Sequence, residues 1–301
     1  MSAVVPGSAA VPGLRNSIAD EDVRAPKEFS GHLSLSAAVN ARGRTVLAGQ
    51  SFRAPFHLSK PYWDEDARTL LVQVVNPTAG ILAGDRLEAT IAVQAEASLL
   101  VTTPSASRVF HMRDGAAECR QHFAVAAGGW LEVMPEPLVP HRASRYRQTT
   151  TIDVAEGGTL FFVDQLMPGR IAHGEAWAWE RLVLDLSVRA GGELILREHF
   201  DPAGTELLAL SKLAGTGGEA CFANAVLVAP TSPDESDPPW RAPLAALHTA
   251  GLWVGVSRLR RAGWSLKVIA PGSIRLRGAL REIRRVLAPY FPRLGCDPRK
   301  L

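Results

Sequence analysis

Two ionisable side chains lie on apolar faces of predicted β-strands. Alternate residues of a strand share a face, so Asp164 and Glu198 each fall on a face otherwise made of leucine and phenylalanine. A buried carboxylate shifts its pKa, pairs with a positive side chain or binds a metal ion, because burying the bare charge is costly. Asp164 and Glu198 are therefore candidate cation ligands, unless an arginine such as Arg170 or Arg197 neutralises them.

Two loops carry further polar groups. Asp85 ends a glycine-rich turn, and Ser107 lies in a segment rich in hydroxyl side chains. Together with Asp164 and Glu198, these residues support the hypothesis of a polar path through the interior of the sheet.

His173 and Glu175 lie two residues apart in a loop between glycines. They are candidates for the mouth of such a path or for a transient pair of metal ligands. The alternative is a purely structural loop in which Arg170 holds Glu175. The other histidines lack a ligand spacing such as His-x-x-x-His, so we expect neither a permanent metal site nor a permanent cofactor.

The elements that would position these residues are short strands separated by turns that contain glycine. The predicted strands are 51–58, 69–75, 87–93, 98–103, 117–125, 130–134, 146–154, 159–163, 177–188 and 193–200. Many short strands at regular spacing are typical of a sandwich, a barrel or a solenoid of sheet, and not of a parallel α/β fold. We therefore predict a mainly β protein, built on a large multi-stranded sheet scaffold that is sandwich-like or solenoid-like.

The last third of the chain changes character. A loop rich in proline and acidic residues at 231–239 precedes apolar residues at helical spacing. A predicted strand at 265–270 and a predicted helix at 279–288 follow, which gives a C-terminal α-β-α segment. We divide the chain into a disordered leader at 1–30, a β-rich core at 31–230 and an α/β segment at 231–301 packed on the core.

Composition restricts the compartment. The 301 residues are 47% hydrophobic, but no apolar run reaches the roughly 18 residues that a membrane helix needs. The beginning of the chain lacks the basic region of a signal peptide. The three cysteines are far apart, so neither a disulfide framework nor a zinc site is indicated. We predict a cytoplasmic protein that does not bind a membrane.

The charge is uneven along the chain. The formal net charge is only +3, yet arginines gather beyond residue 258. This fits a solvated helix face or an acidic protein partner. Aromatic residues do not interleave with the arginines as a base-stacking surface requires, so we expect no nucleic acid partner.

Three blocks of sequence carry a resemblance to a known family. They are residues 76–85 (NPTAGILAGD), 102–110 (TTPSASRVF) and 169–175 (GRIAHGE). In this order they resemble the blocks of the urease accessory protein UreD family, also called UreH. Ala79 and Ala83 stand where that family usually has glycine, which predicts a stiffer first loop. The resemblance runs from about residue 31 to about residue 295.

The resemblance implies a non-catalytic maturation factor that joins UreF and UreG on apo-urease and helps deliver nickel through an internal passage. Carboxylate, hydroxyl and water oxygens suit this task, because they hold nickel more weakly than imidazole or thiolate cages. Asp85, Ser107, Asp164 and Glu198 would then line the passage, with nickel in transit.

Two other functions stay open. One is a carbohydrate-acting hydrolase or lyase that uses Asp164 and Glu198 as its pair of carboxylates. The other is a non-catalytic β binding module whose basic C-terminal end is the docking surface.

Overall fold

The computed structural model describes residues 30–230, 237–261 and 263–299. The predicted leader, apart from Ser30, and most of the acidic loop at 231–239 lie outside the described residues.

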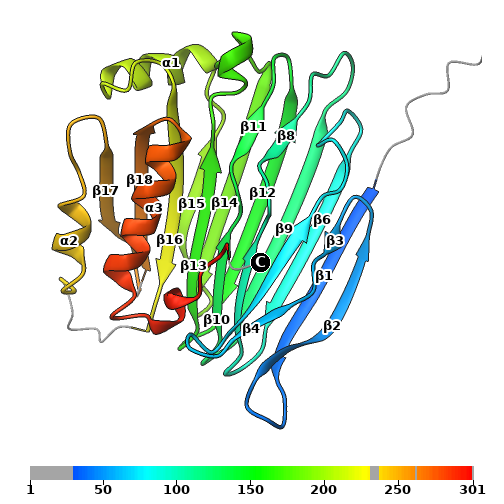
Figure 1. Ribbon diagram of the computed structural model, residues 1–301, viewed down its shortest axis with the longest axis vertical. Helices are drawn as coiled ribbons and strands as arrows, with labels where there is room; N and C mark the ends of the chain where they lie inside the picture. The colour runs from blue at the N-terminus through cyan, green and yellow to red at the C-terminus, as the bar shows by residue number, and fades with distance from the viewer. Residues whose placement is uncertain (1–29, 231–236, 262, 300–301) are drawn as a thin grey trace, which may run out of the picture.

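Two large sheets make up most of the described chain (Figure 1). The smaller sheet has the spatial order β15-β14-β12-β9-β6-β1-β2. Its strands are β1 (Ser30–Val39), β2 (Thr45–Arg53), β6 (Arg86–Val93), β9 (Ala117–Val125), β12 (Arg145–Val154), β14 (Arg181–Ala190) and β15 (Glu193–Phe200).

The larger sheet has the order β17-β18-β16-β13-β10-β7-β5-β3, with three short strands beside this path. Its strands are β3 (His57–Leu58), β4 (Tyr62–Asp64), β5 (Thr69–Val75), β7 (Ser98–Thr102), β8 (Ser107–Val109), β10 (Trp130–Met134), β11 (Leu138–Pro140), β13 (Thr159–Leu166), β16 (Ala220–Val228), β17 (Trp253–Arg258) and β18 (Gly263–Pro271).

The chain winds between the two sheets as a solenoid. Apart from the short strands β8 and β11, successive strands from β5 to β14 lie alternately in the larger and the smaller sheet, so that β5, β7, β10 and β13 pair in parallel. In the smaller sheet β6, β9, β12 and β14 also pair in parallel. Strands β16, β18 and β17 then extend the larger sheet in antiparallel pairing. The prediction of a mainly β, solenoid-like scaffold is confirmed.

Strand β13 is covered on both faces. Leu160 and Phe162 belong to the core between the two sheets. Phe161 and Val163 point to the other side, where they pack with the C-terminal helix. All four are fully buried, which explains the unbroken apolar run in the sequence. Each such side chain contributes about 1.5–3 kcal/mol through burial.

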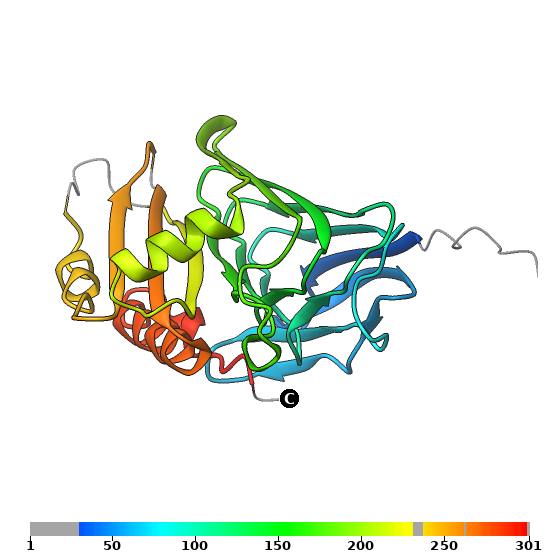
Figure 2. The same cartoon turned by 90° about the horizontal axis from the view of Figure 1, so that it is seen from above.

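Helices cover the outer face and one end of the larger sheet (Figure 2). They are α1 (Gly204–Leu213), α2 (Arg241–Ala245) and α3 (Ser273–Leu287), with short 3-10 turns η1 (Ile171–His173) and η2 (Pro292–Gly295). The apolar side of α3, which includes Leu280, Ile283 and Leu287, is buried against the outer face of this sheet. None of the helices in the described part of the chain has the length and apolar content to cross a lipid bilayer.

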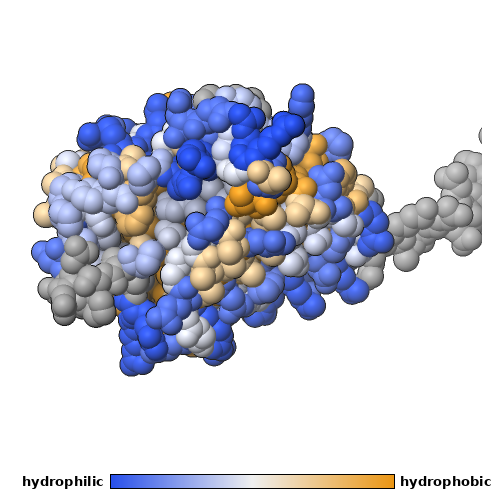
Figure 3. Space-filling model, turned by 90° about the horizontal axis from the view of Figure 1, so that it is seen from below, coloured by the Kyte–Doolittle hydropathy of each residue, from blue (hydrophilic) through white to orange (hydrophobic). Residues whose placement is uncertain are grey.

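The surface seen from below is mainly hydrophilic, with hydrophobic residues gathered in a small central area (Figure 3). The buried apolar residues are instead concentrated in the core between the sheets and under α3.

Candidate functional site

A cavity of about 320 Å³ lies between the two sheets, and we call it the inner cavity. Two loops that are distant in sequence, at 76–81 and 103–108, both line it. These loops carry most of the first two sequence blocks. Seven polar side chains from the longer strands also line the cavity: Thr102, Cys119, Gln121, Tyr146, Gln148, Asp164 and Gln165. The cavity is therefore a partly polar space inside an otherwise apolar core.

Asp164 is the ionisable group with the most perturbed environment in this cavity. Its Oδ2 atom accepts a hydrogen bond of 3.4 Å from Nε2 of Gln148 on the opposite sheet. The pKa of Asp164 is raised to about 7, mainly by burial. The hydrogen bond from Gln148 and the charge of Lys267 oppose this rise, and the charge of Glu198 adds to it. At neutral pH this side chain therefore exchanges readily between a neutral acid and a carboxylate.

Strand β12 supplies the opposite wall. Tyr146, Gln148 and Thr150 alternate along it and are all buried. The Tyr146 hydroxyl donates to Oε1 of Gln148 at 3.2 Å, and the Thr150 hydroxyl donates to Oε1 of Gln121 at 3.1 Å. The buried polar atoms thus satisfy one another. The sequence hypothesis missed this wall, although the same alternation that placed Asp164 would have placed Gln148 beside Tyr146.

Two further groups in the wall stay protonated at neutral pH. Burial raises the pKa of the Cys119 thiol to about 11. It also raises the pKa of Tyr146 well above its usual value. Thiolate is the form that binds soft metals strongly, and the raised pKa makes this form of Cys119 less accessible.

The structure brings only part of the predicted path together. Ser107 and Asp164 line the inner cavity, whereas Asp85 and Glu198 are not among its lining residues. Asp85 is buried and its Oδ2 accepts a hydrogen bond of 2.8 Å from the backbone N–H of Leu82. Burial raises the pKa of Asp85. This carboxyl closes its own turn.

Glu198 is held at the junction of the two sheets. Nδ2 of Asn224 donates to its Oε2 at 2.6 Å, and the ammonium of Lys267 pairs with its Oε1. The residue opposite Asp164 on β16 is this same Asn224. Glu198 therefore lies behind the cavity wall, with Asn224 between it and Asp164. Its cationic partner is Lys267, and not Arg170 or Arg197.

Glu175 forms a bidentate ion pair. Its two carboxylate oxygens accept hydrogen bonds of 2.9 and 2.6 Å from the Arg170 guanidinium. This pairing is the main reason why the pKa of Glu175 falls to about 2. His173 lies in η1 of the same loop. The contacts favour the structural alternative over a ligand pair, and the described residues contain no group of three histidine, cysteine or acidic side chains placed to hold a metal ion.

The first loop keeps glycine where its backbone requires it. Gly80 has φ of +150° and Gly84 has φ of +83°, a region that side chains disfavour. A Cβ at Gly80 would also lie 2.6 Å from the carbonyl oxygen of Arg108. Ala79 and Ala83 are not among the residues with positive φ, so the loop accommodates both alanines without strain.

A second cavity, of about 430 Å³, lies between the larger sheet, α3 and the C-terminal segment 295–299. We call it the outer cavity. Six residues line both cavities and form what we call the portal: Thr102, Thr103, Pro104, Pro135, Glu136 and Gln165. The portal is therefore a wall that the two cavities share.

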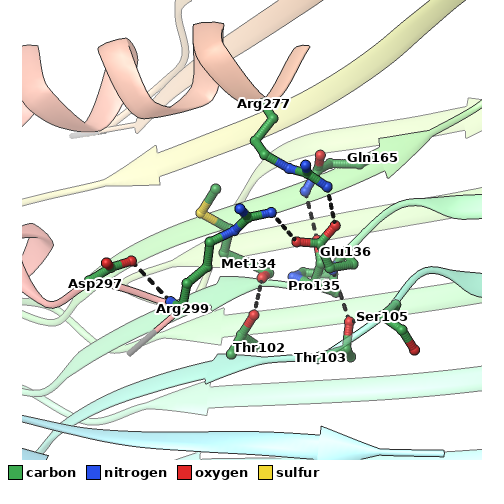
Figure 4. Close-up of polar contacts among 10 residues, drawn as sticks. All are labelled: Thr102, Thr103, Ser105, Met134, Pro135, Glu136, Gln165, Arg277, Asp297 and Arg299. Carbon is green, nitrogen blue, oxygen red and sulfur yellow. Dashed lines mark hydrogen bonds and ion pairs between the residues drawn. The ribbon is translucent and has the colours of Figure 1, made fainter. Parts of the chain in front are cut away.

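The portal exists because β10 is interrupted. Pro135 and Pro137 cannot donate a backbone hydrogen bond, so the ladder stops at Met134. Side chains take over: the Thr102 hydroxyl donates to the carbonyl of Met134 at 2.8 Å, and the Gln165 amide donates to that of Pro135 at 2.7 Å (Figure 4). The two prolines were the sequence signal for this break.

Comparisons with known proteins agree with the blocks in the sequence. A family model described as UreD urease accessory protein matches residues 30–300. A protein of Opitutus terrae named urease accessory protein UreD is 64% identical over 274 residues, which are 91% of this chain and all of that protein. Urease accessory protein UreD 2 of Streptomyces griseus is 31% identical over 85% of this chain and 88% of its own length. A UreD of Yersinia enterocolitica is 39% identical over 59% of this chain and 54% of its own.

Proposed function

Since the chain belongs to the UreD family of urease accessory proteins, we propose that it helps to deliver nickel to apo-urease and that the nickel passes through the inner cavity. The observation that carries this proposal is the position of Asp164 inside the cavity. It is a half-buried carboxyl group that accepts a hydrogen bond from the amide of Gln148 on the opposite wall. Its pKa of about 7 lets it bind and release a cation near neutral pH.

Oxygen ligands that bind nickel weakly favour its transfer over its storage. Asp164 and Ser107 both line the inner cavity, and neither imidazole nor thiolate accompanies them in the described wall, because the Cys119 thiol stays protonated. Nickel bound by such donors exchanges faster than nickel in a thiolate or imidazole cage. Glu198 and Asp85 would act from outside the wall, Glu198 through its effect on the pKa of Asp164.

The partners in this proposal are UreF, UreG and the apo-urease subunits, which the chain would hold together as a scaffold. It would act in the cytoplasm as a chaperone, without catalysing a reaction itself. The large two-sheet solenoid supports a scaffold role because it offers long, rigid faces for other proteins.

The carbohydrate-acting alternative has less support. Glycoside hydrolysis needs two carboxylates that face one cleft. Of the two candidate carboxylates, only Asp164 lines the inner cavity, while Glu198 is engaged by Asn224 and Lys267. The other carboxylate in the cavity wall, Glu136, is paired with Arg277 and Arg299. No observation on the described residues favours this alternative over nickel delivery.

The experiment that tests the proposed function is complementation. The gene is deleted in its host, nickel is supplied, and urease activity is measured with and without the restored chain. We expect activity to fall on deletion and to return with the chain. Full urease activity in the deletion strain would overturn the proposal.

A further inference from the structure

One carboxylate sits between two arginines in the outer cavity. Oε2 of Glu136 lies 3.1 Å from Nη2 of Arg277 on α3. Its Oε1 lies 3.3 Å from Nη2 of Arg299 in the C-terminal segment. Each oxygen thus has its own guanidinium, and the two arginines reach Glu136 from different elements (Figure 4). Charge-assisted contacts of this kind are stronger than hydrogen bonds between neutral groups.

The outer cavity carries more positive than negative charge. Four arginines line it, but Arg284 is committed to the buried Glu132, 2.8 Å away. Arg277, Arg281 and Arg299 remain, against Glu136 and Asp297. If Glu136 moved away, only Asp297 would oppose three guanidinium groups. The cavity would then attract an anion more strongly.

Glu136 is held loosely enough to be replaced. The side chains of Arg277 and Arg299 are 39% and 53% exposed, and that of Glu136 is 23% exposed. Ion pairs between groups this exposed add little net stability. A second carboxylate could therefore take the place of Glu136 at small cost. The cavity volume of about 430 Å³ leaves room for more than one side chain.

We propose that the outer cavity binds an acidic segment of a protein partner, and that Glu136 occupies its carboxylate site while the partner is absent. A polypeptide is the expected ligand because the site already accepts a glutamate side chain from an extended segment between two prolines. Glu136 also belongs to the portal, so its displacement would loosen the wall between the two cavities. The proposal goes beyond nickel delivery and does not depend on it.

The test is the binding of a fluorescein-labelled hexaglutamate peptide to the full chain, followed by fluorescence anisotropy at fixed ionic strength. We expect Arg277→Gln to weaken binding roughly threefold to tenfold, as the loss of one charge-assisted contact at a partly exposed site implies. Arg275→Gln is the matched control, because Arg275 is an exposed arginine of the same helix that does not line the cavity. It should leave the affinity nearly unchanged.

The second pair of variants tests whether Glu136 competes with the peptide for the same arginines. Glu136→Gln removes the internal carboxylate and should tighten peptide binding roughly threefold to tenfold. Glu282→Gln removes an exposed carboxylate of α3 that pairs with Arg285 outside the cavity, and should change binding little. Because Glu136→Gln predicts a gain of affinity, a loss of folding cannot imitate its result.

Two outcomes would overturn the proposal. One is an equal effect of target and control in both pairs, since the peptide would then respond only to overall charge. The other is displacement of the peptide by inorganic phosphate at the same ionic strength and at equal concentration, since the cavity would then be a site for small anions. Neither outcome would bear on nickel delivery.

Discussion

The side-chain amide of Gln148 on β12 donates a hydrogen bond of 3.4 Å to the carboxyl group of Asp164 on β13. This contact joins the two sheets across the inner cavity. It also offsets part of the rise in pKa that burial causes, and the resulting pKa of Asp164 is about 7. The glutamine therefore helps to hold the acid near the point at which it can exchange a proton for a metal cation.

Replacing Asp164 by asparagine should make stability less dependent on pH. The folded protein binds the proton of Asp164 more tightly than the unfolded chain, because its pKa is about 7 and not 3.8. The stabilisation is complete below pH 3.8 and is lost as the pH rises through 7. Relative to the wild type, Asp164→Asn should therefore gain on the order of 4 kcal/mol between pH 4 and pH 8.

Urea denaturation at both pH values measures this gain. If the free energies of unfolding of variant and wild type differed by the same amount at pH 4 and at pH 8, the raised pKa of Asp164 would be contradicted. Asp201→Asn is a suitable control, since Asp201 does not line the inner cavity and pairs with Arg181, which stays charged over this pH range.

Gly80→Ala should destabilise the protein, whereas Ala79→Gly should be nearly neutral. The new Cβ at residue 80 would meet the backbone oxygen of Arg108 at 2.6 Å, at a φ of +150°. Such strain costs on the order of 1–3 kcal/mol. Thermal unfolding of the two variants measures the difference. Equal unfolding midpoints would mean that the loop does not need glycine at this position.

Glu175 should contribute to the stability of the fold, whereas His173 should not. Glu175→Gln should lower the urea midpoint at pH 7, because it weakens the bidentate pair with Arg170. That pair stabilises the fold above pH 4.5 and its effect is lost as the pH falls towards 2. His173→Ala should leave the midpoint unchanged. If both variants stay stable but both reduce urease activation, the two residues act as a ligand pair.

The buried pair of Glu132 and Arg284 fastens α3 to β10. The two side chains are 2.8 Å apart and are almost inaccessible to solvent. Removing one partner leaves a buried charge, so Glu132→Leu or Arg284→Leu alone should each cost about 3–5 kcal/mol. The double change Glu132→Leu with Arg284→Leu should restore much of that loss. A double-mutant cycle in urea checks it, and additive losses would show that the residues are not coupled.

Much of the fold could be predicted because strand periodicity is local. Strands β9 and β15 have the predicted bounds, and Asp164 faces the interior as its alternation with Phe162 requires. Helix α1 and strands β1, β16 and β17 were not predicted. β17 is short, half exposed and interrupted by Gly255, so its pattern is too weak to show which sheet it joins.

The candidate site was harder to predict because it depends on contacts between distant residues. Alternation shows that Asp164 points inward, but not that Gln148 opposes it. Asp85 was placed on the path because of its charge and its loop, yet its carboxyl binds the backbone of Leu82. Glu136 drew no attention in the sequence, since only the fold brings Arg277 and Arg299 beside it.

The most direct test of the central claim is the nickel content of urease made in the deletion strain with a blocked inner cavity. Ala106→Phe places a large side chain in the cavity wall, and Ala124→Phe makes the same change at a residue of β9 that does not line the cavity. With both variants folded and equally abundant, we predict that urease loses most of its nickel with Ala106→Phe and keeps it with Ala124→Phe. Full nickel content with Ala106→Phe would contradict passage through the inner cavity.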